Sequence, residues 1–208
     1  MHGQYIMEFI SIGPYCCTAD LLKAHRLRRT AYPFDYIFSS LEIVKHAIKD
    51  NFNIFLDKQY YTEGTTPDST IHTFYCKFLD TDLLLQHHMK ENYPKDYKVS
   101  SGNMFHHHNL MSNDMYENYK RRCYRLMNVI NSGKKIGLVY YNCYTTDFDD
   151  LIDFSNNFVE NKNIYVVGIF QNNGEQKILY ESPNCKIYQN YDTKIICNEV
   201  KTMCMRPR

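Results

Sequence analysis

Apolar positions along this chain recur with two periods, and each period predicts one kind of element. Apolar residues at helical spacing predict a helix that starts near Cys16 or Cys17, and further helices over 41–52, 81–90, 114–132 and 147–159. Apolar or alternating runs of strand length predict strands over 8–12, 70–78, 135–142, 163–170, 177–180 and 186–188, and a strand approach over 103–107. Candidate helix caps are Thr18, Ser39 or Ser40, and Ser112 or Asn113.

The order of these elements predicts an α+β fold, built as a single domain with a mixed β-sheet flanked by helices. An α/β three-layer arrangement is the alternative. We expect the domain to span residues 1–198 and to be followed by a poorly ordered tail over 199–208. A chain of 208 residues buries enough surface to fold without disulfides or metals.

Charge and hydropathy exclude several classes of partner. The chain has 24 Lys and Arg against 23 Asp and Glu, a net charge of +1, which argues against a mainly electrostatic nucleic-acid binder. Its longest apolar runs, 136–141 and 164–170, are too short to cross a bilayer, and its first residues do not form a secretory signal. We therefore expect a cytoplasmic protein with no nucleic-acid or membrane partner; the oligomeric state stays open.

The eight cysteines and nine histidines raise the question of a scaffold, a metal site or a catalyst. The cysteines are irregularly spaced, which favours free thiols over a disulfide framework. The sequence contains no CxxC or HExxH motif, and neither phosphate-binding glycine pattern, GxxxxGK[ST] or GxGxxG, occurs. We therefore expect no metal and no cofactor.

Cys16 lies where a strand turns into a helix, two residues after the Gly13-Pro14 pair. The N–H groups and the macrodipole of a helix start stabilise a thiolate, so a cysteine there is a candidate nucleophile. The same N–H groups can hold an oxyanion during acyl transfer. Cys17 competes for this role, and packing in the core is the plainer interpretation of either residue.

Three consecutive histidines, His106, His107 and His108, are the second chemical feature. On an extended segment His106 and His108 share one face and His107 takes the other. Such a cluster supplies a general base, a pair of metal ligands or merely surface side chains.

Four short motifs follow one another along the chain. They are SIGPYC at 11–16, LRRTAYPFDY at 27–36, FHHHN at 105–109, and Tyr119 with Arg121, Arg122 and Arg125. Together with the buried strand at 135–140, they resemble a papain-like cysteine peptidase family that occurs in bacteria and large DNA viruses. The resemblance covers roughly residues 8–170. Tyr15 replaces the family's usual Asn before the cysteine, and Tyr36 replaces its Trp.

The resemblance implies a papain-like fold and a cysteine hydrolase of peptidase or amidase type. It places the nucleophile on Cys16 and the base on His107, with a slip to His106 or His108 left open. The chain order of papain-like enzymes then puts Asn142 in the place of the group that orients the imidazole. Asp147 and Asp149 are alternatives for that group. The substrate is a peptide or another amide, and a viral member would act in the host cytoplasm.

Two other charged groups in the motifs have plainer interpretations. We expect Asp35 to pair locally with Arg28 or Arg29. The Arg121, Arg122 and Arg125 cluster is expected to pair with carboxylates, the alternative being a grip on an anionic substrate.

Three other functions stay open at this stage. The chain could be a non-catalytic binding or host-interaction module on the same fold. It could be a transferase or glycan-modification protein that uses the arginines for a phosphorylated donor. A metal-binding protein that uses Cys16 and the histidines is the third.

Overall fold

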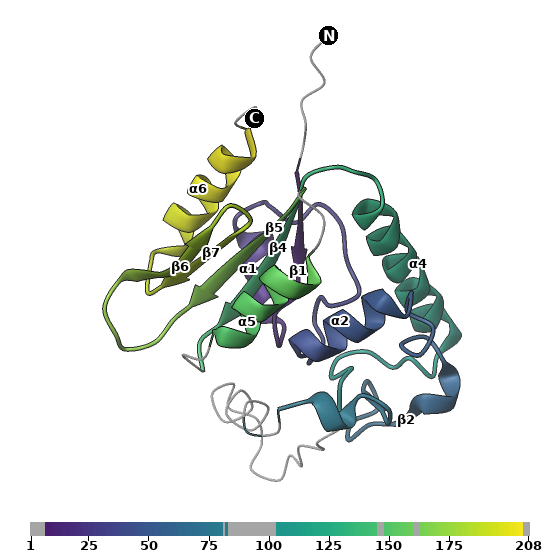
Figure 1. Cartoon of the computed structure of the whole chain (residues 1–208). Helices are drawn as coiled ribbons and strands as arrows, with labels where there is room; N and C mark the ends of the chain where they lie inside the picture. Colours follow the sequence, from purple (N-terminus) through teal and green to yellow (C-terminus); the bar gives the residue numbers. More distant parts are fainter. Residues whose placement is uncertain (1–6, 81, 83–102, 145–147, 160–162, 206–208) are drawn as a thin grey trace.

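The computed structural model describes residues 7–80, 82, 103–144, 148–159 and 163–205 (Figure 1). Its main sheet has five strands, which are β1 (Glu8–Ser11), β4 (Ile136–Asn142), β5 (Ile164–Phe170), β6 (Lys177–Ser182) and β7 (Cys185–Gln189). Their order across the sheet is β1-β4-β5-β7-β6. The strands β1, β4, β5 and β7 run parallel to one another, and β6 runs antiparallel to β7, so the predicted mixed sheet is confirmed.

Helices cover both faces of this sheet. They are α1 (Cys17–Ala24), α2 (Leu41–Lys49), α4 (Asn113–Ile130), α5 (Asp149–Asp153) and α6 (Thr193–Met205). The core on one face combines sheet residues with α2, α4 and α5, and the core on the other face combines them with α1 and α6. The helices therefore form a layer on each side of the mixed sheet.

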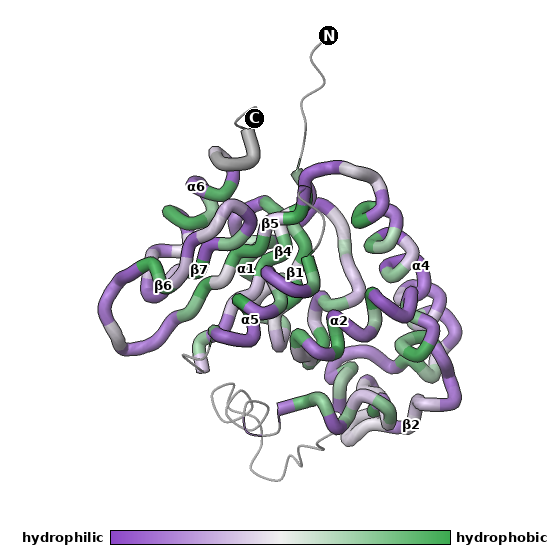
Figure 2. Tube along the Cα trace, in the orientation of Figure 1, coloured by the Kyte–Doolittle hydropathy of each residue, from purple (hydrophilic) through white to green (hydrophobic). Residues whose placement is uncertain are grey.

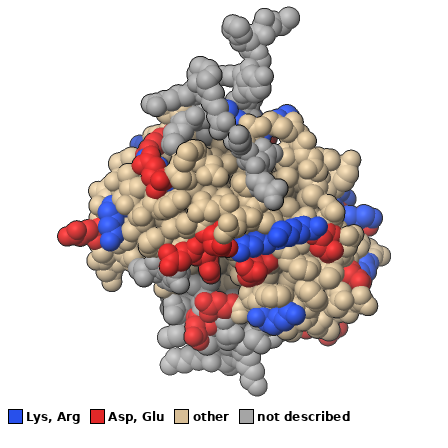
Figure 3. All heavy atoms as spheres, in the orientation of Figure 1, with Lys and Arg blue, Asp and Glu red and all other residues tan. Residues whose placement is uncertain are grey.

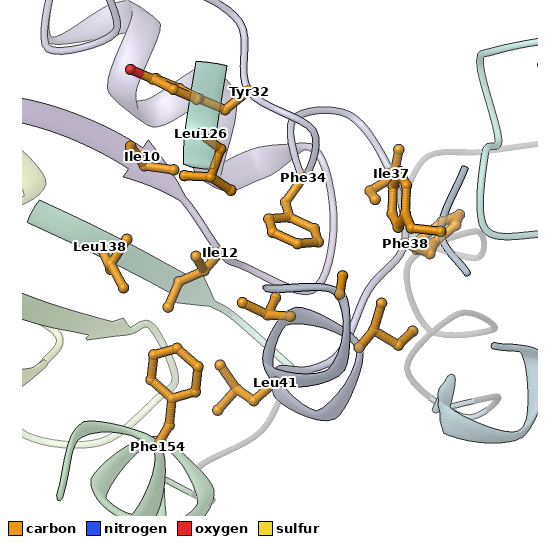
Figure 4. Packing of buried hydrophobic residues seen from close by; sticks show 14 of the residues in the cluster. Ile10, Ile12, Tyr32, Phe34, Ile37, Phe38, Leu41, Leu126, Leu138 and Phe154 are labelled. Carbon is orange, nitrogen blue, oxygen red and sulfur yellow. The ribbon is translucent and has the colours of Figure 1, made fainter. Parts of the chain in front are cut away.

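Alternation along the strands divides the sheet side chains between the two cores. In β4, Leu138 packs on the α2 and α4 side, whereas Val139 packs on the α1 and α6 side. The apolar residues concentrate along the central strands (Figure 2). Figure 4 shows Ile12, which directly follows β1, and Leu138 of β4 near Phe154, on the face that also carries α2.

A second, smaller region lies beyond the carboxyl ends of the parallel strands (Figure 1). It contains β2 (Tyr61–Glu63), β3 (Thr70–His72) and the 3₁₀ turns η1 (Lys58–Tyr60) and η2 (Cys76–Phe78). The predicted strand over 70–78 ends at His72, because the backbone turns there and the N–H of Tyr75 bonds to the carbonyl of His72 at 3.0 Å. The strand approach at 103–107 is a single bridge between Thr70 and Phe105.

The prediction of a C-terminal tail over 199–208 is wrong for residues 199–205, which are helical. Residues up to Met205 belong to α6, and Val200 is buried against the sheet with Ile196 and Cys197. These three residues form an apolar stripe at helical spacing, which stabilises the segment as a helix.

The other predicted helices are partly described. The helix expected over 147–159 is α5 followed by a π-helical turn, η3 (Phe154–Phe158), and Asp147 lies outside the described residues. The helix expected over 81–90 lies outside them except for Asp82. No helix in the described part of the chain is long and apolar enough to cross a membrane.

Two of the three predicted caps are confirmed. Ser40 accepts a hydrogen bond from the N–H of Ile43, and Ser112 accepts one from the N–H of Met115. Thr18 is not a cap, because it lies inside α1. Its hydroxyl donates to the carbonyl of Tyr141 and accepts from the N–H of the same residue. Thr18 therefore fastens the start of α1 to β4.

Gly13 is required by this contact. A Cβ at Gly13 would lie 1.8 Å from the hydroxyl oxygen of Thr18, which the backbone of Tyr141 holds in place. We expect Gly13→Ala to lower the free energy of unfolding by about 1–3 kcal/mol, measured by chemical denaturation. Gly133→Asn is the comparison, because a Cβ added there would meet no atom within 4 Å, so that its cost comes only from the φ of 68°, which Asn adopts more readily than most residues. Equal effects of both variants would contradict this role of Gly13.

Candidate active site

The candidate site lies where β1 and β4 end side by side. These strands are parallel neighbours, with Ser11 opposite Val139, and the N–H of Ile12 donates to the carbonyl of Val139 at 2.9 Å. The turn that leads to Cys16 therefore runs beside the residues that follow Tyr140. The carboxyl ends of parallel strands are the usual location of ligand sites in such sheets.

Cys16 is the N-cap residue of α1, in agreement with the helix start predicted near Cys16 or Cys17. Its backbone is already helical, with φ −55° and ψ −28°, and its side chain makes no capping hydrogen bond. Its carbonyl accepts the N–H of Asp20 at 3.0 Å, and the residue is partly exposed. A thiolate at this position meets the positive end of the helix. Cys17 packs against the core instead.

Tyr15 fixes the turn before Cys16 to the end of β4. Its side chain is 1% exposed, and its hydroxyl donates to Oδ1 of Asn142 at 3.2 Å. The same hydroxyl accepts from the N–H of Cys143 at 2.8 Å, and its ring meets Tyr144 edge-on at 5.1 Å. Burial raises the pKa of Tyr15 far above its usual value, so the hydroxyl stays protonated. The sequence indicated no role for this tyrosine beyond its departure from the family's Asn.

Asn142 is buried at the end of β4, and its amide group bonds to tyrosines and backbone. Oδ1 accepts from Tyr15 and from the N–H of Tyr144 at 2.9 Å, while Nδ2 donates to the hydroxyl of Tyr140 at 3.3 Å. These hydrogen bonds join Asn142 to the turn of Cys16 through Tyr15. Asp149, one of the two alternatives, is exposed at the start of α5, and Asp147 lies outside the described residues.

A loop over residues 31–40 forms the next wall of the site. Asp35, 1% exposed, accepts from Nε of Arg28 at 2.8 Å and from the N–H of Tyr32 at 2.9 Å, as the expected local pairing requires. Burial raises the pKa of Asp35, and the N–H of Tyr32 and the Arg28 guanidinium oppose that rise. Ser39 then joins this loop to the Cys16 turn, since its hydroxyl donates to the carbonyl of Gly13 at 2.9 Å.

The histidine segment is attached to the same loop. The N–H of Phe38 donates to the carbonyl of Met104 at 2.9 Å, and the Phe38 ring lies 5.6 Å from the ring of His106. The chain makes a turn after Phe105 rather than continuing extended. Backbone contacts therefore connect the Cys16 turn, the loop over 31–40 and the histidines.

The three histidines have different surroundings. His106 is buried, and its Nδ1 lies 3.4 Å from Nδ2 of Asn103. His107 is exposed. His108 is half-buried, and its Nδ1 shares a hydrogen bond of 2.9 Å with the hydroxyl of Tyr119. Burial, and after it the charge of Arg122, lowers the pKa of His108 to about 4.

The arginine cluster points mostly inward. Arg122 lies over the ring of Tyr119 at 4.7 Å, and its charge helps to stabilise the Asp35 carboxylate. Arg125 donates to the carbonyl of Ala31. Arg121 is exposed. Two of the three arginines therefore support the loop over 31–40.

A cavity of about 220 Å³ opens beside the Cys16 turn. Its wall includes Pro14, Ser39, Glu42, Asp80, Tyr140 and Asn142. Acidic and basic side chains lie side by side on the face of the molecule drawn in Figure 3. Within the described residues, no group of three or more His, Cys, Asp and Glu side chains is arranged to hold a metal ion.

A family model with the description "putative papain-like cysteine peptidase" matches residues 7–164, which include every motif described above. No curated protein and no solved structure matches the chain.

The buried histidines make stability depend on pH. Burial lowers the pKa of His72 and of His108 to about 4, so between about pH 6.5 and 4 the unfolded chain binds protons that the folded chain does not. We expect the free energy of unfolding to fall as the pH is lowered through this range, by up to about 1.4 kcal/mol per pH unit for each histidine. The His108→Asn variant should show a shallower fall in denaturation experiments. An unchanged slope would show that His108 titrates normally.

Proposed function

The chain belongs to the family described as putative papain-like cysteine peptidases, and we propose that it is a cysteine hydrolase acting on a peptide or another amide. Cys16 is the proposed nucleophile and His107 the proposed general base. The position of Cys16 at the start of α1, directly after β1, is the observation that carries the proposal. Peptide, isopeptide and other amide substrates all fit this chemistry.

The proposed reaction is acyl transfer in two steps. His107 takes the proton of the Cys16 thiol, and the thiolate attacks the carbonyl carbon of the substrate. N–H groups at the start of α1 stabilise the oxyanion, and His107 returns the proton to the leaving amine. Water, with His107 again as base, then releases the acyl group from the sulfur.

The surroundings of the three histidines favour His107 as the base. A general base works best with a pKa near the working pH, which the low pKa of His108 does not provide. The Nδ1 atoms of His106 and His108 also lie next to Asn103 and Tyr119. His107, between them, has the exposed side chain.

In this proposal Asn142 is a positioning residue. It acts through the hydroxyl of Tyr15, which connects β4 to the turn that carries Cys16. This arrangement differs from direct orientation of the imidazole, the role that the resemblance implies for Asn142.

The proposal includes a location and a set of partners. None of the seven cysteines whose side chains the structure describes forms a disulfide, which fits a cytoplasmic enzyme, or one in the host cytoplasm for a viral protein. The balanced charge fits a peptide or amide substrate better than nucleic acid. A transferase that grips an anionic donor is less well supported, because Arg122 and Arg125 turn toward the protein.

Thiol reactivity tests the choice of nucleophile. We expect iodoacetamide at neutral pH to label Cys16 faster than each of the other seven cysteines, because the helix start favours its thiolate. Peptide mass spectrometry after short exposures measures this. Cys17→Ser should leave the fast labelling in place and Cys16→Ser should remove it. Slow, uniform labelling of all eight cysteines would contradict the assignment of Cys16 as the nucleophile.

Turnover tests hydrolysis itself and separates an enzyme from a binding module. A library of fluorogenic peptide amides should yield a substrate whose hydrolysis falls by at least about 100-fold in His107→Asn, the scale of a lost general base. His106→Asn, a change to the neighbouring histidine, should have a smaller effect. A larger loss of hydrolysis in His106→Asn than in His107→Asn would contradict His107 as the base and indicate His106 instead. Binding of peptides without hydrolysis would favour the module.

A further inference from the structure

We propose that Tyr119 and Arg122 on the buried face of α4 position the histidine segment of the active site through His108. The inference rests on the proposed function, since it concerns the base that serves Cys16. It also gives a role to the tyrosine and arginines of the fourth sequence motif. His108, Tyr119 and Arg122 are positioning residues, and none of them is proposed to touch the substrate.

Tyr119 and Thr70 hold His108 by its ring and by its backbone. The hydroxyl of the fully buried Tyr119 lies 2.9 Å from Nδ1 of His108, and the two rings are 5.4 Å apart. The hydroxyl of Thr70 donates to the carbonyl of His108 at 3.2 Å. The ring of Phe105, 5.3 Å from that of Tyr119, closes the other side of the tyrosine. His107 thus lies between His106, which is buried, and His108, which Tyr119 and Thr70 hold by hydrogen bonds.

Arg122 adds an electrostatic constraint. Its guanidinium lies 4.7 Å from the centre of the Tyr119 ring, and both Arg122 and His107 raise the cost of a charge on His108. A neutral His108 adds no positive charge next to His107 when His107 takes a proton. That favours a thiolate and imidazolium pair with Cys16.

The pH dependence of Cys16 alkylation tests this role. Iodoacetamide reacts with the thiolate, so the ratio of its rate at about pH 6 to its rate at about pH 10 reports how far His107 stabilises the thiolate. Tyr119→Phe keeps the ring and removes only the hydroxyl. We expect it to lower this ratio by about tenfold, the effect of a one-unit rise in the pKa of the thiol.

Two matched comparisons separate positioning from general damage. Tyr61→Phe also removes a buried tyrosine hydroxyl, one that donates to the carbonyl of Phe55 at 2.6 Å, and should keep the wild-type ratio. His108→Asn offers an amide in place of Nδ1 and cannot titrate, so it should stay within about threefold of wild type. His108→Ala should fall as far as Tyr119→Phe.

The outcomes separate this inference from the proposed function. A wild-type protein with no enhanced reactivity of Cys16 at about pH 6 would contradict the proposed function and with it this inference. A reactive wild type with an unchanged ratio in Tyr119→Phe, or an equal loss in Tyr61→Phe, would overturn the inference alone. So would a loss in His108→Asn as large as in His108→Ala, because His108 would then be the base. The two His108 variants decide the question if Tyr119→Phe does not fold.

Discussion

The buried hydroxyl of Tyr15 is the constraint on which the candidate site depends. A buried hydroxyl needs hydrogen-bond partners, and this one finds them in Asn142 and in the N–H of Cys143, 127 and 128 residues away in the chain. The two bonds fix the Cys16 turn to the end of β4. Three residues later, Thr18 also joins the start of α1 to β4, because its hydroxyl bonds to the backbone of Tyr141. The start of α1, which carries Cys16, is therefore positioned by the sheet rather than by a side-chain cap of its own.

The rest of the site is assembled from loops around this fixed point. The hydroxyl of Ser39 donates to the carbonyl of Gly13. Phe38 contacts the histidine segment twice, through its N–H on the carbonyl of Met104 and through its ring beside that of His106. The helix α4 supports both the loop over 31–40 and the histidine segment. Arg125 donates to the carbonyl of Ala31, and the hydroxyl of Tyr119 shares a hydrogen bond with Nδ1 of His108. Contacts between residues far apart in sequence thus connect the histidine segment, through the loop over 31–40, to the turn that leads to Cys16.

Local pattern predicts much of the fold and one part of the site. The run from β1 through Gly13 to the start of α1 is encoded in consecutive residues, and so are the buried strands β4 and β5. The contacts of Tyr15 are not predictable in this way, because partners so distant in the chain leave no periodic signal. The histidine motif reads as an extended segment, but the single bridge at Phe105 ends the pairing and lets the chain turn. The helix α6 is not among the predicted elements, although Ile196 and Val200 lie at helical spacing, and part of it falls in the expected tail.

The central claim is that these contacts bring Cys16 and His107 together as a catalytic pair. The most direct test is a crystal structure of the protein with Cys16 trapped by a peptide aldehyde, which bonds to the sulfur as a substrate carbonyl would. The account predicts a ring nitrogen of His107 within about 3.5 Å of the sulfur or of the new hydroxyl. A separation of more than about 10 Å, with no loop closing over the adduct, would contradict it.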